Sequence, residues 1–368
     1  MSGQSVLAGL GRVGLLAAVL LTPVVAQRAG RPPAPAQPAA TQPVATQPAA
    51  LTSATVPLST SVQDESCWLR DVSAPTATNI YTLCQQGTVW VTADGGATWT
   101  KRQTGAKGRL RAIAFMDAKR GITVGDDGAM FATEDAAKTW KPVDSGTKDH
   151  LLDLSFVGEL GWAAGFEGVI LHSTDGGRTW AKQKVDTAQA IESIFFLDAN
   201  QGWAAGWAGT ILRTTNGGKT WQAVKIAQSS WSLTCVYFRD AKEGWISGFD
   251  GQVLHSKDGG LTWESQKSPV QSWLTSIGQD PSGRLWMTYD DGLVTSDDGG
   301  ANWKLVDVGG HFFLGKLFTV DKTMWVLGQS ALLRQSGNGW RRVESLIPDS
   351  TAQLLRASGT DTAAPAKP

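Results

Sequence analysis

Short runs of apolar residues alternate with polar turns rich in Gly, Asp and Asn from about residue 66 to residue 343. One stretch shows the pattern clearly, with apolar runs at residues 190–196, 203–206, 210–215 and 220–226. Runs of this length are too short for typical helices and match the usual length of β-strands. The turns between them are short enough to connect antiparallel neighbours. The pattern therefore predicts units of four short antiparallel strands.

An eight-residue phrase closes each of these units, and it reads "STDGGRTW" at 173–180. Clear or weaker copies occupy residues 92–99, 133–140, 214–221, 256–263, 296–303 and 335–340. The final tryptophans of consecutive copies are 37 to 42 residues apart. Four-stranded units with a period of about 40 residues are typical of β-propeller blades. We therefore expect an all-β fold, a seven-bladed β-propeller over residues 63–344.

The residues of this phrase suit a tight turn. The Asp, or the Asn of one copy, can accept hydrogen bonds from backbone N–H groups, and the Gly pair can take positive φ angles. The Trp opens the last strand of the unit, and we expect its ring to pack between blades. We assign a structural role to Asp94, Trp99, Asp135, Trp140, Asp175, Trp180, Asn216, Trp221, Asp258, Trp263, Asp298, Trp303 and Trp340.

The phrase resembles the Asp-box, or BNR, repeat S/T-x-D-x-G-x-T-W of sialidases and other propellers. A second phrase precedes it, written "DAKRGITVGDDG", "DANQGWAAGWAG" and "DAKEGWISGFDG" in three units. Together the two phrases resemble the photosystem II stability and assembly factor family, over about Ser66 to Val343. The resemblance implies a secreted or lumenal, non-catalytic propeller that binds a protein, such as a subunit of photosystem II or of another envelope complex or exporter.

The N-terminus has the pattern of an export signal. Arg12 precedes the apolar run "VGLLAAVLL", and the small residues around Ala26 fit the rule for cleavage. We expect a signal peptide at 1–26 and a periplasmic location, or the thylakoid lumen in a photosynthetic organism; an uncleaved anchor is the alternative. Residues 27–62, rich in Ala, Pro and Gln, predict a disordered linker, and residues 345–368 predict a flexible tail.

The balance of charges narrows the choice of partners, and the cysteines suggest one disulfide. Lys plus Arg and Asp plus Glu number 33 each, so the charge gives no reason to expect nucleic acid or an anionic membrane as a partner. Cys67 and Cys84 are expected near the same face of the first blade, which makes them a candidate disulfide. Cys235 lies in the apolar run "LTCVYF" and is expected to be a buried free thiol.

A catalytic site is not evident in the sequence. A sialidase needs a nucleophilic Tyr beside a carboxylate, and two of the three tyrosines, Tyr81 and Tyr237, fall in strand patterns. Tyr289 stands beside Asp290 and Asp291 on a predicted turn and is the best candidate. The four histidines do not cluster, and no metal or cofactor motif is present. We expect no enzyme, no cofactor and no metal; the alternative is a glycan-binding or sialidase-like glycoside hydrolase propeller.

One face of the predicted propeller carries large side chains that its turns do not need. The turn between strands two and three of each blade should lie on the same face as the connection that precedes strand one. With a neighbouring basic cluster, these positions give the candidate partner-binding residues Phe166, Trp207, Phe249, Tyr289, Trp231, Trp273, Phe312, Arg109 and Arg111. Exposed aromatic residues often mark interaction surfaces, although these rings can instead cap the blade ends. We expect a monomer that binds a protein through this face.

Overall fold

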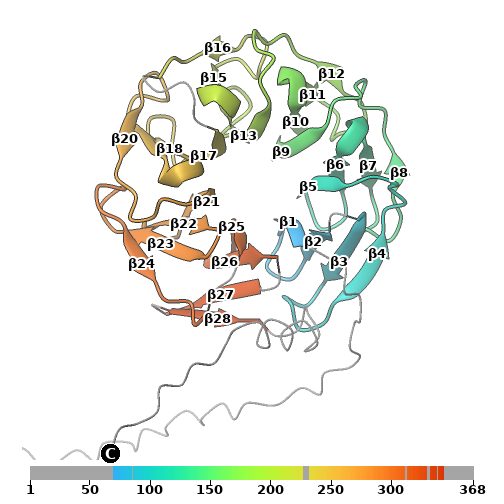
Figure 1. Cartoon of the computed structure of the whole chain (residues 1–368). Coiled ribbons are helices and arrows are strands. Elements are labelled where there is room, and N and C mark those ends of the chain that lie inside the picture. The colour runs from blue at the N-terminus through green and yellow to red at the C-terminus, as the bar shows by residue number, and fades with distance from the viewer. Residues whose placement is uncertain are drawn as a thin grey trace, which may run out of the picture. The chain divides into compact units, whose positions relative to one another are not determined.

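A computed structural model describes residues 69–84, 86–226, 232–310, 313–329, 332–337 and 339–343. These residues form one ring of seven four-stranded antiparallel sheets, shown in Figure 1. The all-β class and the seven-bladed propeller predicted from the repeats are confirmed. The predicted signal peptide, linker and tail, as well as Cys67, Trp231 and Phe312, lie outside the described residues.

Each blade consists of four strands that are consecutive in the sequence and adjacent in the sheet. Blades one to four contain β1 (Leu69–Ser73), β2 (Ile80–Cys84), β3 (Thr88–Thr92), β4 (Thr100–Gln103), β5 (Leu110–Phe115), β6 (Gly121–Gly125), β7 (Met130–Thr133), β8 (Lys141–Pro142), β9 (Leu151–Val157), β10 (Leu160–Gly165), β11 (Ile170–Ser173), β12 (Ala181–Lys182), β13 (Ile191–Phe196), β14 (Gly202–Gly206), β15 (Ile211–Thr214) and β16 (Gln222–Ala223). Blades five to seven contain β17 (Leu233–Phe238), β18 (Gly244–Gly248), β19 (Val253–Ser256), β20 (Glu264–Gln266), β21 (Leu274–Gln279), β22 (Leu285–Tyr289), β23 (Gly292–Ser296), β24 (Lys304–Val306), β25 (Leu314–Val320), β26 (Thr323–Gly328), β27 (Leu332–Ser336) and β28 (Gly339–Arg342). Short 3-10 turns connect strands two and three in blades two to five: η1 (Asp126–Gly128), η2 (Phe166–Gly168), η3 (Trp207–Gly209) and η4 (Phe249–Gly251).

The first strand of each blade lies nearest the centre of the ring, and the fourth lies at the outside (Figure 1). First strands of neighbouring blades contact one another, from β1 and β5 around to β21 and β25. The ring closes where β1 contacts β25 and β26. In the part of the chain that the structure describes, no blade takes a strand from elsewhere in the sequence. The junction between blades seven and one is therefore built from packing and side-chain contacts.

Seven apolar clusters hold the ring together, one at each junction between neighbouring blades. The largest fully buried side chains in these clusters come from the second strands, and they are Trp162, Trp203, Trp245 and Trp286. The indole of Trp203 stacks on Phe238 of the next blade, with ring centroids 3.6 Å apart. Because burying an indole removes about 150–250 Å² from water, these rings are a large part of the apolar link at the four junctions from blade three to blade seven.

The Asp-box turn makes the hydrogen bonds that its residue types favour. In blade one, the Thr92 hydroxyl donates to Oδ1 of Asp94 at 2.7 Å. The hydroxyl and the N–H of Thr98 donate to the same carboxylate at 2.6 and 2.9 Å. The bond from the Thr98 hydroxyl, with the others, lowers the pKa of Asp94 to about 2. The closing Trp99 donates its indole N–H to the Gly96 carbonyl at 3.1 Å, which completes the turn.

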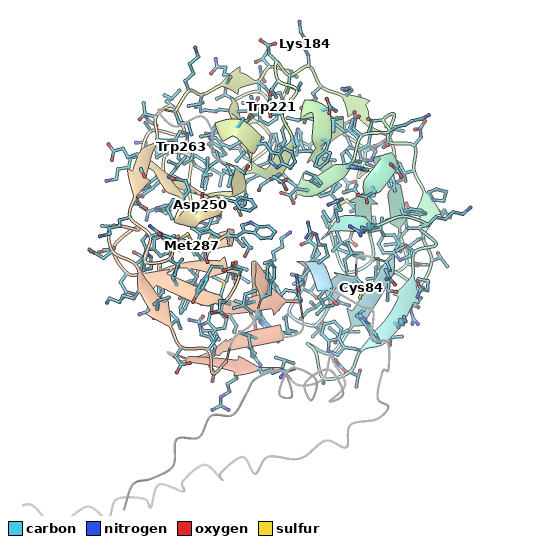
Figure 2. The ribbon with its side chains drawn as sticks, in the orientation of Figure 1. Cys84, Lys184, Trp221, Asp250, Trp263 and Met287 are labelled. Atoms are coloured by element: carbon cyan, nitrogen blue, oxygen red, sulfur yellow. The ribbon has the colours of Figure 1, made fainter. Side chains whose placement is uncertain are left out.

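The closing tryptophans of the Asp boxes support the junctions from outside. Trp221 and Trp263 are half-buried in the outer part of the ring (Figure 2). Trp221 meets Phe196 edge-on with ring centroids 5.8 Å apart, and Phe196 stacks face to face on Trp162 of the preceding blade. Trp221 and Trp263 thus pack against junction clusters that contain the second-strand indoles Trp162 and Trp203.

Close approach explains two glycines of the second repeated phrase. A Cβ at Gly202 would lie 2.4 Å from the ring of Phe196, and a Cβ at Gly206 would lie 2.0 Å from the carbonyl oxygen of Ala190. Gly206 directly precedes η3, the turn that begins with Trp207. The phrase therefore packs strand two against strand one and builds the turn that carries the ring of Trp207.

Two cysteines lie within the described ranges. Cys84 ends β2 and takes part in a disulfide bond. Cys235 lies in β17 and is a free thiol. Because Cys67 lies outside the described residues, its pairing with Cys84 stays a prediction. Within these same ranges, no helix has the length and hydrophobicity needed to cross a bilayer.

Candidate functional site

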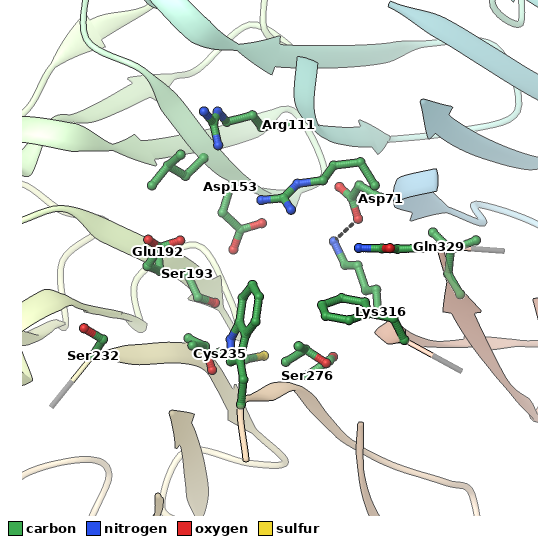
Figure 3. A pocket seen from close by; sticks show the side chains of 18 of the residues that line it. Asp71, Arg111, Asp153, Glu192, Ser193, Ser232, Cys235, Ser276, Lys316 and Gln329 are labelled. Carbon is green, nitrogen blue, oxygen red and sulfur yellow. Dashed lines mark ion pairs between the residues drawn. The ribbon is translucent and has the colours of Figure 1, made fainter. Parts of the chain in front are cut away.

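A cavity of about 620 Å³ lies at the centre of the ring, between the first strands of the blades. All seven blades contribute to its lining. Figure 3 shows Asp71, Asp153, Cys235 and Lys316 reaching into it from blades one, three, five and seven. Binding sites are usually concave, with apolar walls and a few convergent polar groups. This cavity has that character, and we take it as the candidate site.

A β-bulge in every first strand sets which side chains meet at the cavity. The pairing register shifts once in each first strand, for example between Leu151 and Asp153 in β9. The residue that follows the shift occupies the same place in all blades, as Asp71, Ala112, Asp153, Ser193, Cys235, Ser276 and Lys316. We call these residues the inner ring, and all except Ala112 line the cavity. Bulges often re-aim side chains in this way.

Four inner-ring side chains accept a hydrogen bond from the next blade. Oδ2 of Asp71 accepts from the backbone N–H of Ile113 at 2.8 Å. Oδ2 of Asp153 accepts from the backbone N–H of Ile194 in blade four at 2.9 Å. The hydroxyl oxygen of Ser193 accepts a longer bond, at 3.3 Å, from a backbone N–H of blade five. The hydroxyl oxygen of Ser276 accepts one at 3.2 Å from a backbone N–H of blade seven. The polar side chains at the centre of the ring therefore join neighbouring blades.

Lys316 is the cation of the inner ring. Its Nζ lies 2.5 Å from Oδ1 of Asp71, across the junction between blades seven and one (Figure 3). Burial alone would lower the pKa of Lys316, but the carboxylates of Asp71 and Asp153 raise it above its ordinary value. Burial raises the pKa of Asp153 to about 6, although the charge of Lys316 opposes this shift. The cavity thus holds one ion pair and one carboxyl group that titrates just below neutral pH.

Aromatic side chains surround the mouth of the cavity over blades three to seven. Trp207 and Phe249 are the first residues of η3 and η4 and are 43% and 41% exposed. The ring centroid of Phe249 lies 5.0 Å from that of Trp273, which lies 5.6 Å from that of Phe313. In blade three, Phe166 lies 5.5 Å from Trp207. We call these five residues the aromatic rim; it exposes apolar surface at a concave site.

The mouth is polar over blades one and two. Arg70 and Arg111 line the cavity there, and Arg111 forms an ion pair with Asp126. Asp126 begins η1, so it takes the position that exposed rings take in η3 and η4. Burial and the nearby Arg111 charge lower the pKa of Arg70. A ligand on this face meets apolar surface on one side and charge on the other.

Five of the predicted partner-binding residues line the cavity: Phe166, Trp207, Phe249, Trp273 and Arg111. Tyr289 ends β22 and packs against the cluster between blades five and six, away from the cavity lining. Arg109 is exposed just before β5 and is also outside the lining. Trp231 and Phe312 are outside the described residues, whereas Phe313 belongs to the aromatic rim.

Sequence reasoning missed the charged residues of the inner ring. Asp71, Asp153 and Lys316 stand in the strands LRDVS, LLDLSFV and LGKLFTV. The available signal was a charged residue two places after the leading Leu in three of the first strands. Since Asp or Lys in a buried strand costs free energy unless it is paired, that repeated position marks a group of interacting charges.

The tyrosines weighed as nucleophiles have structural surroundings. Tyr81 is buried, and its hydroxyl donates to the carbonyl of Ala118 at 2.7 Å. Tyr237 packs against Trp245, with ring centroids 6.4 Å apart. Over the described ranges, no group of three or more His, Cys, Asp or Glu side chains is arranged to hold a metal ion. In the described part of the chain, three carboxyl groups line the cavity: Asp71 and Asp153 accept hydrogen bonds from neighbouring blades, and Glu192 accepts from the indole N–H of Trp207 in its own blade.

The repeat sequence matches a known family. Residues 106–187 and 178–275 match the family model described as Photosynthesis system II assembly factor YCF48. Over residues 106–275 the propeller resembles the YCF48 family. No curated protein matches the sequence.

Solved structures of YCF48 share the propeller. One described as YCF48 bound to D1 peptide aligns with a TM-score of 0.54 and 24% identity, over 65% of this chain and 82% of that one. YCF48 from Cyanidioschyzon merolae aligns with a TM-score of 0.61 and 18% identity, over 72% and 94%. An ancestral GH74 enzyme aligns with a TM-score of 0.61 and 14% identity, over 76% of this chain and 46% of the enzyme. At these identities the structural likeness shows the fold alone.

Proposed function

We propose that this YCF48-like propeller is a non-catalytic, monomeric binding protein whose aromatic rim holds a segment of a protein partner. The observation that carries the proposal is the exposure of Trp207 and Phe249 on neighbouring blades at the mouth of a cavity. A YCF48 structure described as bound to a D1 peptide supports a peptide as the ligand. The role is assembly or stabilisation of a membrane protein complex, photosystem II or another envelope complex, after export to the periplasm or thylakoid lumen.

The rings of the mouth are fixed before a partner arrives. Trp207 donates its indole N–H to Glu192 at 2.6 Å, and Phe249 stacks on Trp273. Pre-ordered side chains lose little conformational entropy on binding, and large aromatic rings are frequent anchors at protein interfaces. We infer that an apolar side chain of the partner packs on the aromatic rim. The polar part of the same segment faces the arginines of blades one and two.

Site-specific photo-crosslinking in cells tests this proposal. A photoreactive residue in place of Phe166 reports on the aromatic rim. The same residue in place of Leu305, which is 60% exposed on β24, is the matched control. We expect position 166 to capture a subunit of a membrane complex that position 305 does not capture. The same set of captured proteins from both positions would contradict a binding face at the cavity.

The competing hypothesis is a propeller that binds or hydrolyses glycans. Its structural basis is the presence of aromatic rings near carboxyl groups, on a fold shared with the ancestral GH74 enzyme. Hydrolysis needs an acid and a base or nucleophile on opposite sides of the glycosidic bond. Asp71 and Asp153 instead accept hydrogen bonds from neighbouring blades. Turnover of a sialoside or uronide by the purified protein, abolished in Glu192→Gln, would favour a hydrolase at this cavity.

A further inference from the structure

The inner ring carries an ion pair at one junction, between blades seven and one, whereas Ala112 and Cys235 hold the inner-ring position at the junctions after blades two and five. In four of the other junctions, an Asp or Ser oxygen accepts a hydrogen bond from a backbone N–H of the next blade. The donor is always the residue directly after the next blade's inner-ring residue, such as Leu317 after Lys316. At the junction between blades seven and one, the accepting position is held by Lys316. An ammonium group only donates, so this junction cannot form the bond used in those four.

Lys316 bonds a carboxylate instead. Its Nζ lies 2.5 Å from Oδ1 of Asp71. Val72, whose N–H is the donor that the other junctions would use, donates at 2.8 Å to the same Oδ1. The second oxygen, Oδ2, accepts from Ile113 of blade two at 2.8 Å. One carboxylate thus joins blades seven, one and two.

The two partners of this ion pair differ in their exposure. The side chain of Asp71 is 5% exposed, whereas that of Lys316 is 38% exposed and lines the cavity. Such a pair is stronger than a surface salt bridge, yet ions that enter the cavity can screen it. The apolar cluster at this junction is of the same kind as those at the other six. An ion pair at the inner-ring position is what distinguishes this junction among the described residues.

We propose that the Asp71–Lys316 ion pair is the latch that closes the propeller ring, so that the junction between blades seven and one opens locally before the others. Opening there separates β1 from β25 and β26, the elements in contact at this junction. The cavity widens at the same time, because both partners of the latch line it. This inference goes beyond partner binding and does not depend on it.

The surrounding charges give the latch a pH response. The other charged or titratable groups that line the cavity are Arg70, Arg111, Asp153, Glu192 and Cys235. Asp153 is one of the two carboxylates that stabilise the charge of Lys316. Its pKa is about 6, so that contribution is lost as the pH falls through this value. Protonation also removes the repulsion between Asp153 and Asp71, and the raised pKa means that the closed ring binds this proton more tightly than an opened ring does. The latch is therefore expected to hold at mildly acidic pH and to loosen as the pH rises above about 6.

Hydrogen–deuterium exchange of the full chain tests the latch. In the unsubstituted protein, amides of β1 and β26 should exchange faster as NaCl is raised from about 0.05 to about 1 M, while amides of β13 and β17 should not respond. Lys316→Met keeps the aliphatic stem and removes the charge. It should raise exchange in β1 and β26 by about tenfold or more and remove the salt response.

Ser193→Ala is the matched control, because it removes an uncharged link between blades four and five. It should raise exchange in β13 and β17 only, at every salt concentration. Lys316→Arg keeps the charge and should retain the salt response of the unsubstituted protein. An even rise in exchange over all junctions in Lys316→Met would overturn the proposal. So would the absence of a salt response in the unsubstituted protein, a test that stands even if a variant fails to fold.

Discussion

At the scale of single residues, position in the repeat decides whether a ring holds the fold or is available to a partner. Trp203 lies in the second strand of blade four and is fully buried. Trp207, four residues later, begins η3 and is 43% exposed. The two are the same residue type in the same short phrase. Gly206 separates their roles, because it ends the strand and starts the turn.

This contrast gives a matched pair of substitutions. Trp203→Ala should lower the free energy of unfolding by about 3–5 kcal/mol, because it leaves a large cavity between blades four and five. Trp207→Ala should change it by less than about 1 kcal/mol, because that ring is partly solvated. Urea denaturation of both variants is the measurement. A loss at Trp207 as large as that at Trp203 would show that the rim ring belongs to the core.

The Asp boxes predict acid sensitivity. Burial would raise the pKa of Asp175, but hydrogen bonds from Thr179 and Ser173 lower it to about 2. A carboxylate with a lowered pKa in the folded state adds stability above its unfolded pKa of about 4. That contribution is lost as the pH falls towards about 2. Several boxes share this shift, so the propeller should lose stability over this interval.

Asp175→Asn isolates the contribution of one box. Asn216 already occupies this place in blade four and accepts from the N–H of Thr220 at 3.0 Å, so Asn can preserve the turn. The variant should be slightly less stable at pH 7, and its stability should fall less between about pH 4 and about pH 2. Denaturation curves across this range are the test. An unchanged pH dependence would mean that the carboxylate does not contribute as described.

At the scale of strands and turns, the repeat made the blades predictable because each blade is one contiguous stretch of sequence. The apolar run at 190–196 corresponds to β13 (Ile191–Phe196), one residue shorter. The run at 220–226 contains a much shorter strand, β16 (Gln222–Ala223). The first and the fourth strands both pair on one side only, but the first strand also packs against the first strands of neighbouring blades. The fourth strand lies at the outside of the ring, so the apolar pattern overestimates its length.

The candidate site was predictable at its mouth and not at its centre. An aromatic side chain beside Gly does not help to form a turn, so its presence there indicates another role. This reasoning predicted Trp207 and Phe249. It failed for Tyr289, because β22 and β23 are separated by two residues and no 3-10 turn lies between them. Tyr289 therefore stays in a strand. The inner ring escaped prediction because each β-bulge changes which way Asp153 and its equivalents point, and a bulge leaves little trace in one sequence.

The close contact of Gly202 in β14 with Phe196 in β13 gives a prediction about stability. Gly202→Ala should cost about 1–3 kcal/mol, because the new Cβ would lie 2.4 Å from the ring of Phe196. Gly108→Ala is the control, since the nearest atom to a Cβ there, Cβ of Asp126, lies 4.0 Å away. Thermal unfolding of both variants decides the matter. Equal Tm values for the two variants would show that blade four has room that the structure does not indicate.

At the scale of the whole molecule, the residues proposed to bind a partner differ from the buried side chains that join the blades. Second-strand indoles and the inner ring join the blades, as Trp203 and Asp71 do. The turns on one face carry the aromatic rim around a cavity that all blades line. Rim rings of neighbouring blades also touch, as Phe166 and Trp207 do, but the buried clusters lie beneath them at every junction. On the proposed function, a partner therefore binds exposed rings that the buried core does not need.

The most direct test combines two readouts on one variant. Trp207→Ala with Phe249→Ala should reduce the crosslinking yield from position 166 by about tenfold, since it removes both exposed anchors. Its Tm should stay within about 3 °C of that of the unsubstituted protein. An undiminished crosslinking yield would contradict partner binding at the rim. A large fall in Tm would show instead that these rings hold the ring of blades together.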